Sequence, residues 1–345
     1  MSDTGPQAIA VDKVSSWISD NVEVDGALTY SLIAGGRSNM TFTVSDNSGV
    51  RFVLRRPPTG KLLPSAHDMA REYRLMRSLR NTEVPVPEMV GLCQDQRVNG
   101  RDFYVMHYVE GVVVRDLEVA SKMSPEARAN MSESLIDTLC ALHRVDIDDV
   151  GLGDLAKHSG YIERQIKRWS SQWENSRTRD IPLVDSVARE LIRQMPEPNP
   201  TTIAHGDYRL SNCMVDSSGS VIAVLDWELC TLGEPMADLA GLLGYWYDAN
   251  SDDELIGDAA TTRLSGFMSQ DELAARYAEE MGIAVVSVDY YRAFAEWRLA
   301  CIGEGVYSRY LQGQQGIQSE EIDLRQMKES VFTRVEKASL LLNME

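Results

Sequence analysis

The spacing of apolar residues is mostly that of strands before Gly111 and mostly that of helices after it. Before Gly111, helical spacing of apolar residues predicts helices at residues 11–22 and 65–80. Strand-like runs predict five strands, at residues 28–33, 42–44, 52–55, 89–93 and 103–109. After Gly111 the period becomes helical, which predicts helices near residues 124–143, 160–175, 183–195, 236, 270, 288 and 320–342. The segment 202–240 interrupts them with a short strand, a polar loop and a hairpin. We therefore predict an α+β fold with a β-rich N-terminal lobe, residues 1–108, and a mostly helical C-terminal lobe, residues 109–345.

Charge and cysteine content argue against several kinds of partner. The 345 residues include 34 Lys and Arg against 52 Asp and Glu, a net charge of −18 at pH 7. Such an excess of negative charge disfavours nucleic acid or an anionic membrane as a partner. The five cysteines are scattered without a CxxC pair, which indicates reduced thiols. The N-terminus is unlike a signal peptide and no apolar segment reaches membrane-spanning length, so we expect a cytoplasmic protein.

The polar loop of the helical half carries His205-Gly206-Asp207 and Asn212, and Asp226 follows the predicted hairpin. Phosphoryl transfer requires a proton acceptor near the attacking hydroxyl and cations on the phosphate oxygens. Asp207 and Asn212 stand five residues apart, the spacing of the catalytic Asp and the metal-binding Asn in the kinase loop. We therefore predict that Asp207 orients or deprotonates a substrate hydroxyl. Asn212 and Asp226 are predicted to bind Mg²⁺, which prefers oxygen ligands, and Arg209 to neutralise the transferred phosphate.

Each of these residues alone would be weak evidence, but their order is specific. It resembles the aminoglycoside phosphotransferase-like family of kinase-fold proteins, over about residues 28–311. The family's motifs stand here as His205-Gly206-Asp207, Asn212, Asp226-Trp227 and Asp238-Leu239-Ala240. The resemblance implies a bilobal protein-kinase-like fold that uses ATP and Mg²⁺. It also implies that Asp238 braces the catalytic loop and that His205 orients this loop through hydrogen bonds.

The sheet half contains candidate nucleotide-binding residues. The loop Gly35-Gly36-Arg37-Ser38-Asn39 resembles the family's nucleotide loop, where Gly36, Ser38 and Asn39 would approach phosphate; an ordinary hairpin turn fits the same residues equally well. Phe52-Val53-Leu54-Arg55 lies where kinases place Val-Ala-Ile-Lys, and strand alternation puts Val53 and Arg55 on one face, over the nucleotide. Arg55 departs from the usual Lys; its planar fork can still bind phosphate, with a different reach.

Two further segments complete the predicted nucleotide site. Glu72, in the helix of the sheet half, is the expected ion-pair partner of Arg55. The bland alternatives are a surface charge for Arg55 and a solvated helix face for Glu72. The run from Met106 through His107 to Val109 resembles the inter-lobe hinge of kinases, where backbone groups would bind adenine.

The phosphoryl acceptor is less constrained by the sequence. Residues 53–73 look most like the kinase-like domains fused to some acyl-CoA dehydrogenases, in Arg55-Arg56-Pro57-Pro58, Leu63-Pro64-Ser65-Ala66-His67 and Arg71-Glu72-Tyr73. Relatives of those domains phosphorylate 4-hydroxyacyl-CoA compounds, so the resemblance implies a hydroxyacyl-CoA-like metabolite as readily as an aminoglycoside-like compound.

Taken as a whole, the sequence predicts an ATP- and Mg²⁺-dependent O-phosphotransferase that acts on a hydroxyl group of a small molecule. The competing prediction, raised by Arg55, is a nucleotide-binding pseudokinase or interaction module without turnover. An adenylyltransferase on the same fold has no sequence feature in its favour.

Overall fold

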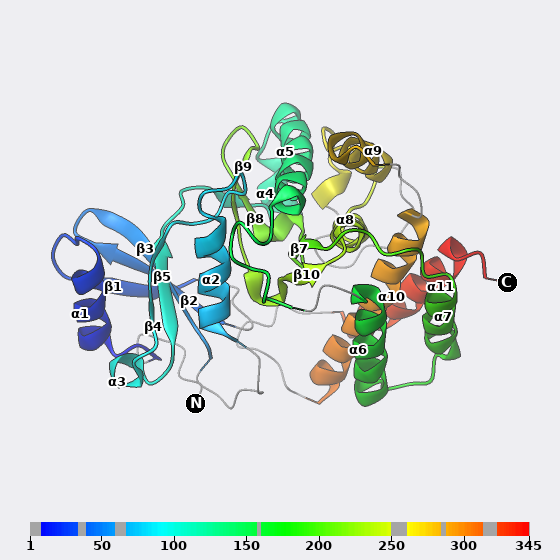
Figure 1. The fold of residues 1–345 in the computed structure, drawn as a ribbon, viewed down its shortest axis with the longest axis horizontal. Coiled ribbons are helices and arrows are strands. Elements are labelled where there is room, and N and C mark those ends of the chain that lie inside the picture. Colours follow the sequence, from blue (N-terminus) through cyan, green and yellow to red (C-terminus); the bar gives the residue numbers. More distant parts are fainter. Residues whose placement is uncertain are drawn as a thin grey trace. The chain divides into compact units, whose positions relative to one another are not determined.

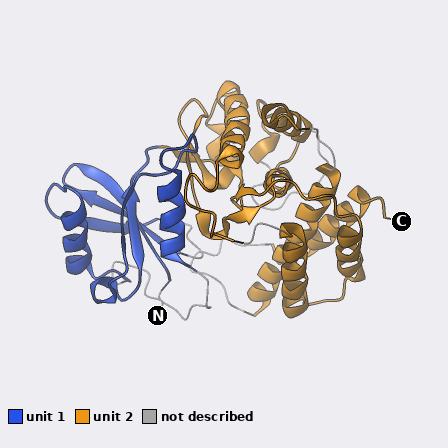
Figure 2. Ribbon diagram, in the orientation of Figure 1, with its two compact units in different colours: residues 1–110, 316–318 blue, residues 111–315, 319–345 orange. Residues whose placement is uncertain are grey.

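The computed structural model describes residues 8–33, 39–58, 67–156, 160–249, 261–283, 288–312 and 323–344. These residues form two compact units, divided in the sequence between Glu110 and Gly111 (Figure 2). Unit 1 precedes this division and unit 2 follows it. Unit 1 is built on an antiparallel sheet and unit 2 is mostly helical, so the predicted α+β fold class is confirmed.

The sheet of unit 1 has five strands in the order β1-β2-β3-β5-β4, all neighbours antiparallel. Their bounds are Thr29–Leu32 (β1), Met40–Asp46 (β2), Gly49–Arg56 (β3), Met89–Cys93 (β4) and Phe103–His107 (β5). A tight turn joins β2 to β3, as predicted. Asp46 shapes it by accepting the backbone N–H of Ser48 at 2.8 Å, and Gly49 supplies a positive φ of 118°.

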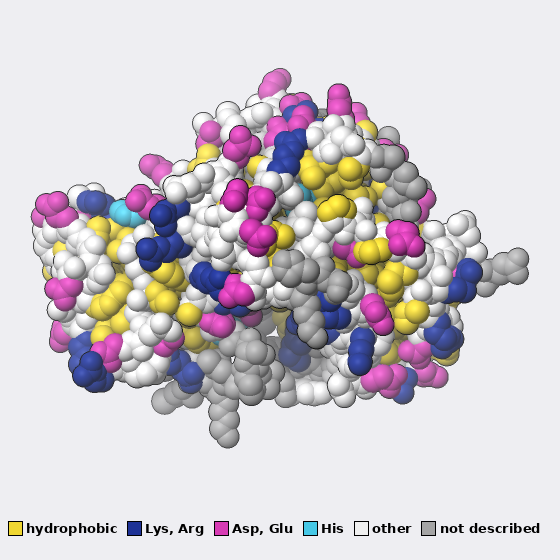
Figure 3. Space-filling model, in the orientation of Figure 1, with side chains coloured by type: hydrophobic (Ala, Val, Ile, Leu, Met, Phe, Trp, Pro, Cys, Tyr) yellow, Lys and Arg dark blue, Asp and Glu magenta, His cyan; other side chains and the backbone are white. Residues whose placement is uncertain are grey.

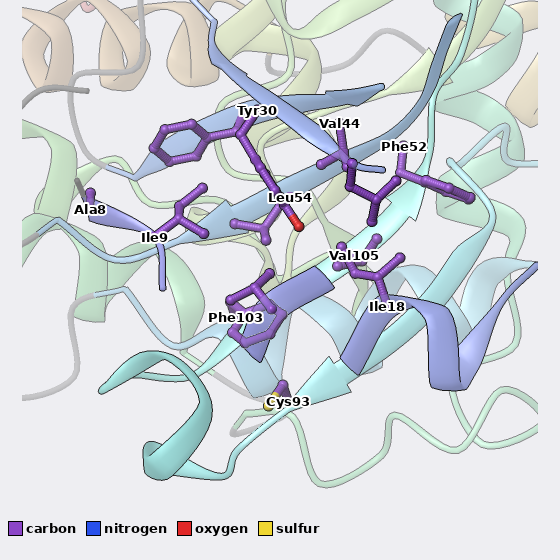
Figure 4. Close-up of a cluster of buried hydrophobic side chains, with 13 residues drawn as sticks. Ala8, Ile9, Ile18, Tyr30, Val44, Phe52, Leu54, Cys93, Phe103 and Val105 are labelled. Carbon is purple, nitrogen blue, oxygen red and sulfur yellow. The ribbon is translucent and has the colours of Figure 1, made fainter. Parts of the chain in front are cut away.

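Helices cover both faces of this sheet (Figure 1). On one face, α1 (Val11–Asn21) packs Val14 and Ile18 onto a buried apolar cluster that includes Phe52, Leu54 and Phe103 (Figure 4). The short helix α3 (Gln96–Asn99) packs beside α1. On the other face, α2 (Met69–Leu79) packs against β4 and β5. Alternate residues of β3 therefore meet two different environments, one apolar and one polar.

Unit 2 is a helical assembly in which α10 is the central member, because it packs against four other helices, α6, α7, α8 and α11. Figure 1 shows α10 running beside α6 and α11. The helices of unit 2 are α4 (Leu117–Ser121), α5 (Pro125–Arg144), α6 (Tyr161–Ser176), α7 (Pro182–Arg193), α8 (Pro235–Gly244), α9 (Gln270–Met281), α10 (Val288–Leu311) and α11 (Leu324–Leu341). The start of α5 is the predicted one: Ser124 caps it by accepting the N–H of Ala127.

Two small sheets are embedded among these helices. The predicted hairpin is present as β8 (Cys213–Val215) and β9 (Val221–Val224), and β6 (Val112–Val113) pairs with β8 as a third strand. The other sheet pairs β7 (Thr202–Ala204) with β10 (Thr231–Gly233). The sequence did not predict β6 or β10, which are too short to show a period of their own.

Buried thiols and a mixed surface agree with the composition. All five cysteines are buried thiols, and burial raises the pKa of both Cys140 and Cys213 to about 12. On the face drawn in Figure 3, acidic and basic side chains alternate without forming a broad patch of one sign. Within the described residues, no helix has the length and apolarity needed to cross a membrane.

Candidate active site

The loop after β7 is held in place by hydrogen bonds to its backbone N–H groups. A single carboxylate, that of Asp238 in α8, accepts the N–H of His205 at 2.5 Å and the N–H of Gly206 at 2.8 Å. Gly206 has a φ of 82°, and a Cβ at this position would lie 2.6 Å from the carbonyl oxygen of Leu229. Only glycine therefore fits between the loop and the segment that leads to β10. The side chain of Asp238 sets the path of the backbone from which Asp207 projects.

Asp238 is 3% exposed, so its charge requires compensation. Burial by itself would raise the pKa of the Asp238 carboxyl, but hydrogen bonding and charge from His143, with further help from His205 and the loop amides, lower that pKa overall. His143, in α5, lies 3.5 Å from Asp238 through Nε2 and meets the hydroxyl of Tyr277 at 2.7 Å through Nδ1. The loop is thus braced through α8 to α5 and α9, in agreement with the role predicted for Asp238.

His205 uses both ring nitrogens within the fold. Nε2 lies 2.9 Å from the carbonyl oxygen of Leu225, so it carries the proton and donates it. Nδ1 then accepts the backbone N–H of Asp207 at 3.3 Å. The ring is fully buried and packs on Trp227 at a centroid distance of 4.9 Å. These contacts make His205 a link between the loop and the end of β9, as predicted, and leave no nitrogen for proton transfer.

Asp207 has a partly exposed carboxylate, 22% accessible, surrounded by donors. The amide nitrogen of Asn212 donates to Oδ2 of Asp207 and to its backbone carbonyl, both at 2.9 Å. Arg209 approaches the same Oδ2 at 3.4 Å and lies over the ring of Tyr245 at 4.8 Å. Burial raises the pKa of the Tyr245 hydroxyl, so it stays protonated at neutral pH. The structure therefore brings together three of the predicted residues, Asp207, Arg209 and Asn212.

Asp226 ends the hairpin that Asn212 begins. The N–H of Leu225 donates to the carbonyl oxygen of Asn212 at 2.8 Å, which holds the two ends of β8 and β9 side by side. Asp226 has left-handed backbone angles, φ 63° and ψ 62°, a conformation that costs most L-residues about 1–2 kcal/mol but is accessible to Asp and Asn. The amide oxygen of Asn212 makes none of the hydrogen bonds found among the described residues. The oxygen atoms that could bind a metal ion are thus one carboxylate, of Asp226, and one amide oxygen, of Asn212, at the same end of a hairpin.

In unit 1, the predicted ion pair is present. Nε of Arg55 lies 3.2 Å from Oε2 of Glu72, with the Arg55 side chain 14% and the Glu72 side chain 3% exposed. Glu72 also accepts the hydroxyl of Tyr104 at 3.0 Å and the side-chain amide of Asn39 at 3.1 Å. A second cluster of polar side chains is therefore centred on a buried carboxylate. Both bland alternatives, a surface Arg55 and a solvated Glu72, are ruled out by this burial.

The register of β3 separates Arg55 from its neighbour Arg56. Val53 pairs with Met106 and Arg55 with Tyr104, all on the α2 face of the sheet. Arg56 lies on the opposite face, 4% exposed, and donates to the carbonyl oxygens of Ala8 and Pro57. The predicted alternation is therefore the one that the structure has.

The predicted hinge residues Met106, His107 and Val109 have different surroundings from one another. Met106 is buried beside Val53, whereas His107 pairs with Phe52 and its ring packs on the Phe52 ring at 5.3 Å. The N–H groups of His107 and Tyr108 donate within the unit, to Glu88 and Arg51. No such bond is found for the N–H of Val109 among the described residues. Gly36 and Ser38 lie outside the described residues.

Several residues of unit 2 that lie near Asp207 were not singled out as site residues. A pocket beside Asp207 is lined by ten residues: Gly206, Asp207, Tyr208, Ala237, Asp238, Gly241, Tyr245, Ala295, Arg298 and Leu299. Arg298, in α10, donates to the carbonyl oxygen of Gly206. It stands more than ninety residues from the loop in a helix without a recognisable motif, so no local signal could have found it.

Comparison with known proteins agrees with this geometry. The profile of the Phosphotransferase enzyme family matches residues 29–276. Acyl-CoA dehydrogenase family member 10 of Mus musculus is 37% identical over 283 residues, which is 81% of this chain and 26% of that protein. Acyl-CoA dehydrogenase family member 11 of Homo sapiens is 34% identical over 297 residues, 84% of this chain and 37% of that protein. The chain thus spans between a quarter and two fifths of the length of these relatives.

Solved structures give the same result. A candidate aminoglycoside phosphotransferase from Ralstonia eutropha superposes with a TM-score of 0.78 at 32% identity, covering 97% of this chain and 98% of its own. The ADP-bound aminoglycoside phosphotransferase APH(2'')-Ib has a TM-score of 0.57 at 15% identity, covering 96% and 99%, and shares the fold. Because the profile covers most of the chain and the Ralstonia structure matches almost end to end, the chain belongs to the phosphotransferase enzyme family.

Proposed function

We propose that this protein is an ATP- and Mg²⁺-dependent O-phosphotransferase that phosphorylates a hydroxyl group of a small molecule. The observation that carries the proposal is the geometry around Asp207. Its carboxylate is partly exposed and oriented by Asn212, on a loop whose backbone is fixed by Asp238. To accept a proton from a substrate hydroxyl, a carboxylate must be held in position and be accessible to the substrate.

In the proposed reaction, Asp207 accepts the proton of the substrate hydroxyl as its oxygen attacks the γ-phosphorus of ATP. The bond between the γ-phosphorus and the bridging oxygen breaks, and ADP leaves with that oxygen. Asn212 and Asp226 would hold Mg²⁺, which offsets charge on the phosphate oxygens. The fit is good because Mg²⁺ is commonly held by one or two protein oxygens together with the phosphates of the substrate. Arg209 would move from Asp207 to the transferred group.

Unit 1 would bind the nucleotide. Arg55, held by Glu72, supplies the cation for the α- and β-phosphates, and its guanidinium can contact two phosphate oxygens at once. The backbone N–H of Val109 is the donor that would meet adenine, because the N–H groups of His107 and Tyr108 are already used. Among the neighbours that share the fold, one holds ADP and another holds ATP with streptomycin.

The competing proposal, a nucleotide-binding module without turnover, rests on Arg55 in place of Lys. The Arg55–Glu72 ion pair weakens that argument, because Arg occupies the position and makes the contact expected of the Lys. Intact Asp207, Asn212 and Asp226 weaken it further.

Two measurements on the same samples test the proposal. Thermal stability is recorded with ATP or GTP, with and without Mg²⁺, and ADP release is followed with Mg²⁺-ATP. We expect Mg²⁺-ATP to stabilise both the wild type and Asp207→Ala, while turnover falls by about 10²–10⁴-fold in the variant. Asp149→Ala, an exposed carboxylate elsewhere in unit 2, is the matched control and should behave as wild type.

Absence of any ATP binding at millimolar Mg²⁺ would refute the kinase function. Stabilisation by Mg²⁺-ATP without ADP release, in the wild type and with every acceptor, would favour the module without turnover.

A further inference from the structure

The pocket beside Asp207 has one cation among the described residues that line it, Arg298. Arg298 lines it and donates to the carbonyl oxygen of Gly206, the residue next to Asp207. The guanidinium of Arg298 also lies 5.5 Å from the centre of the Trp169 ring. A cation over the face of an indole is attracted to the ring, so this contact is a second interaction of the guanidinium. Arg298 is therefore positioned by two contacts, one of them with the residue that precedes the proposed base, Asp207.

A second guanidinium lies on the same ring. Arg168, in α6, is 5.3 Å from the centre of Trp169, whose indole N–H is occupied by Gln165 at 3.1 Å. The side chain of Trp169 is buried, at 6% exposure, whereas Arg168 is exposed. Two like charges on one aromatic ring repel each other, and an anion that contacts either of them would reduce that repulsion.

Carboxylates of the described residues do not supply that anion. Neither Arg168 nor Arg298 forms an ion pair within the described part of the chain. The nearby acids have other partners: Asp238 holds the loop amides, and the buried Glu234 accepts the hydroxyl of Tyr291 at 2.5 Å. Asp207 is bound by Asn212 and Arg209. In a chain of net charge −18, a guanidinium without a carboxylate partner among the described residues, in the pocket that contains Asp207, is a local feature.

We propose that this pocket binds an acceptor that carries an anionic group, a carboxylate or a phosphate, on Arg298, with the exposed Arg168 adding positive charge from its own contact with the Trp169 ring. The acceptor hydroxyl then lies at Asp207. This inference rests on the proposed function and adds the chemical class of the substrate. A guanidinium fork matches the geometry of carboxylate and phosphate, whereas a polycationic aminoglycoside meets two charges of its own sign. Arg168 and Arg298 are thus specificity-determining residues.

Anion binding is tested first, without nucleotide or metal. The thermal stability of the full chain is measured against inorganic phosphate, citrate and kanamycin at constant ionic strength. We expect stabilisation by at least one of the two anions, with phosphate and citrate distinguishing a phosphate-bearing from a carboxylate-bearing acceptor, and none by kanamycin. Arg168→Ala and Arg298→Lys should each weaken the effect about tenfold or more, since charge-assisted contacts are lost or reduced. Arg97→Ala, which removes an exposed guanidinium of unit 1 outside both proposed sites, should retain it. Arg55→Ala is measured beside it, because a loss confined to that variant would assign the anion to the nucleotide site.

The proposal is overturned if neither anion stabilises the wild type, if kanamycin does so, or if only Arg55→Ala abolishes the effect. Because these readouts need no ATP, their failure is distinct from failure of phosphotransfer. ADP release with Mg²⁺-ATP is then compared for glycerol 3-phosphate against glycerol, and for 3-hydroxybutanoate against 1,3-butanediol. Arg168→Ala should raise KM for a charged acceptor about tenfold with kcat unchanged; equal stimulation by a neutral partner contradicts the proposal.

Discussion

Unit 1 and unit 2 each contain a buried carboxylate that gathers hydrogen-bond donors, but the donors differ in kind. Glu72 in unit 1 receives side chains, from Asn39, Arg55 and Tyr104. Asp238 in unit 2 accepts two backbone N–H groups, those of His205 and Gly206, in addition to its contact with the His143 side chain. A side-chain cluster holds the position of one functional group, whereas a backbone cluster fixes the course of the chain itself.

This difference explains where the sequence departs from the kinase pattern Val-Ala-Ile-Lys. Arg can replace Lys at position 55 because Glu72 requires only a cation on the adjacent strand, and the fork satisfies it. No such freedom exists at Gly206, where the positive φ and the carbonyl oxygen of Leu229 both exclude a side chain. We infer that unit 1 tolerates changes that alter affinity, and that unit 2 does not tolerate changes that alter the loop.

The largest effect is expected from Asp226→Asn, which should abolish Mg²⁺-dependent turnover. Asn accepts the left-handed backbone angles of Asp226, so the variant removes the charge without disturbing the hairpin. ADP release is measured as a function of Mg²⁺ concentration, with thermal stability as the folding control. Turnover within tenfold of the wild type at equal Mg²⁺ would show that the metal ligands of unit 2 lie elsewhere.

Asp238→Asn should destabilise the fold by about 3 kcal/mol, because a buried charge partner is lost and one loop N–H meets an amide donor. The pKa of Asp238 is lowered from its ordinary value of 3.8 in the folded protein. Its contribution is therefore complete above pH 3.8 and disappears as pH falls through the lowered value. Denaturant unfolding of wild type and variant from pH 7 to pH 3 checks both statements.

Measurements of kcat and of ATP affinity for one variant in each unit sharpen the comparison between units. Asp238→Asn should lower kcat, since the loop that carries Asp207 loses its support. Glu72→Gln should instead raise the dissociation constant of ATP and change kcat less. If both variants alter the same kinetic parameter to the same extent, the contrast between side-chain and backbone support has no functional meaning.

Arg55→Ala should weaken ATP binding by about one to two orders of magnitude, through the loss of a charge-assisted phosphate contact. Arg55→Lys should recover part of this loss, because Lys keeps the charge but not the fork. Arg56→Ala is the matched control: its guanidinium is buried on the opposite face, so stability should fall while ATP affinity per folded molecule stays constant. Calorimetric titration of the three variants would reverse the assignment if Arg56→Ala proved the one that loses ATP.

Tyr104→Phe is expected to have the smallest effect, a change of about two- to tenfold in ATP affinity. It removes one neutral donor to Glu72 and leaves the Arg55 ion pair, and such a hydrogen bond contributes about 0.5–1.5 kcal/mol. The measurement is the same titration. A loss as large as that of Arg55→Ala would mean that Tyr104 orders the whole cluster.

Most of the fold could be predicted from the sequence because the apolar residues follow the strand period and the helix period clearly. The strand β4 is the predicted one, and α1, α5 and α7 begin and end within two residues of expectation. Within the site, local spacing and strand alternation were sufficient for Asp207, Asn212 and the face of Arg55. Contacts between distant residues with no periodic signal were missed, such as Arg298 on Gly206 and Asn39 on Glu72. A pairing of this kind depends on how whole elements pack, and one sequence does not encode that locally.

The buried cysteines are expected to react slowly with thiol-specific labelling reagents. Thiolates are the species that react with maleimides, and burial keeps the thiols of Cys140 and Cys213 protonated far above neutral pH, with those of Cys93 and Cys301 shifted in the same direction. A cysteine introduced at exposed Asp149 in unit 2, and another at exposed Arg97 in unit 1, would take up dyes while the native thiols stay unlabelled. Energy transfer between such a pair would report the separation of the two units as Mg²⁺-ATP is added.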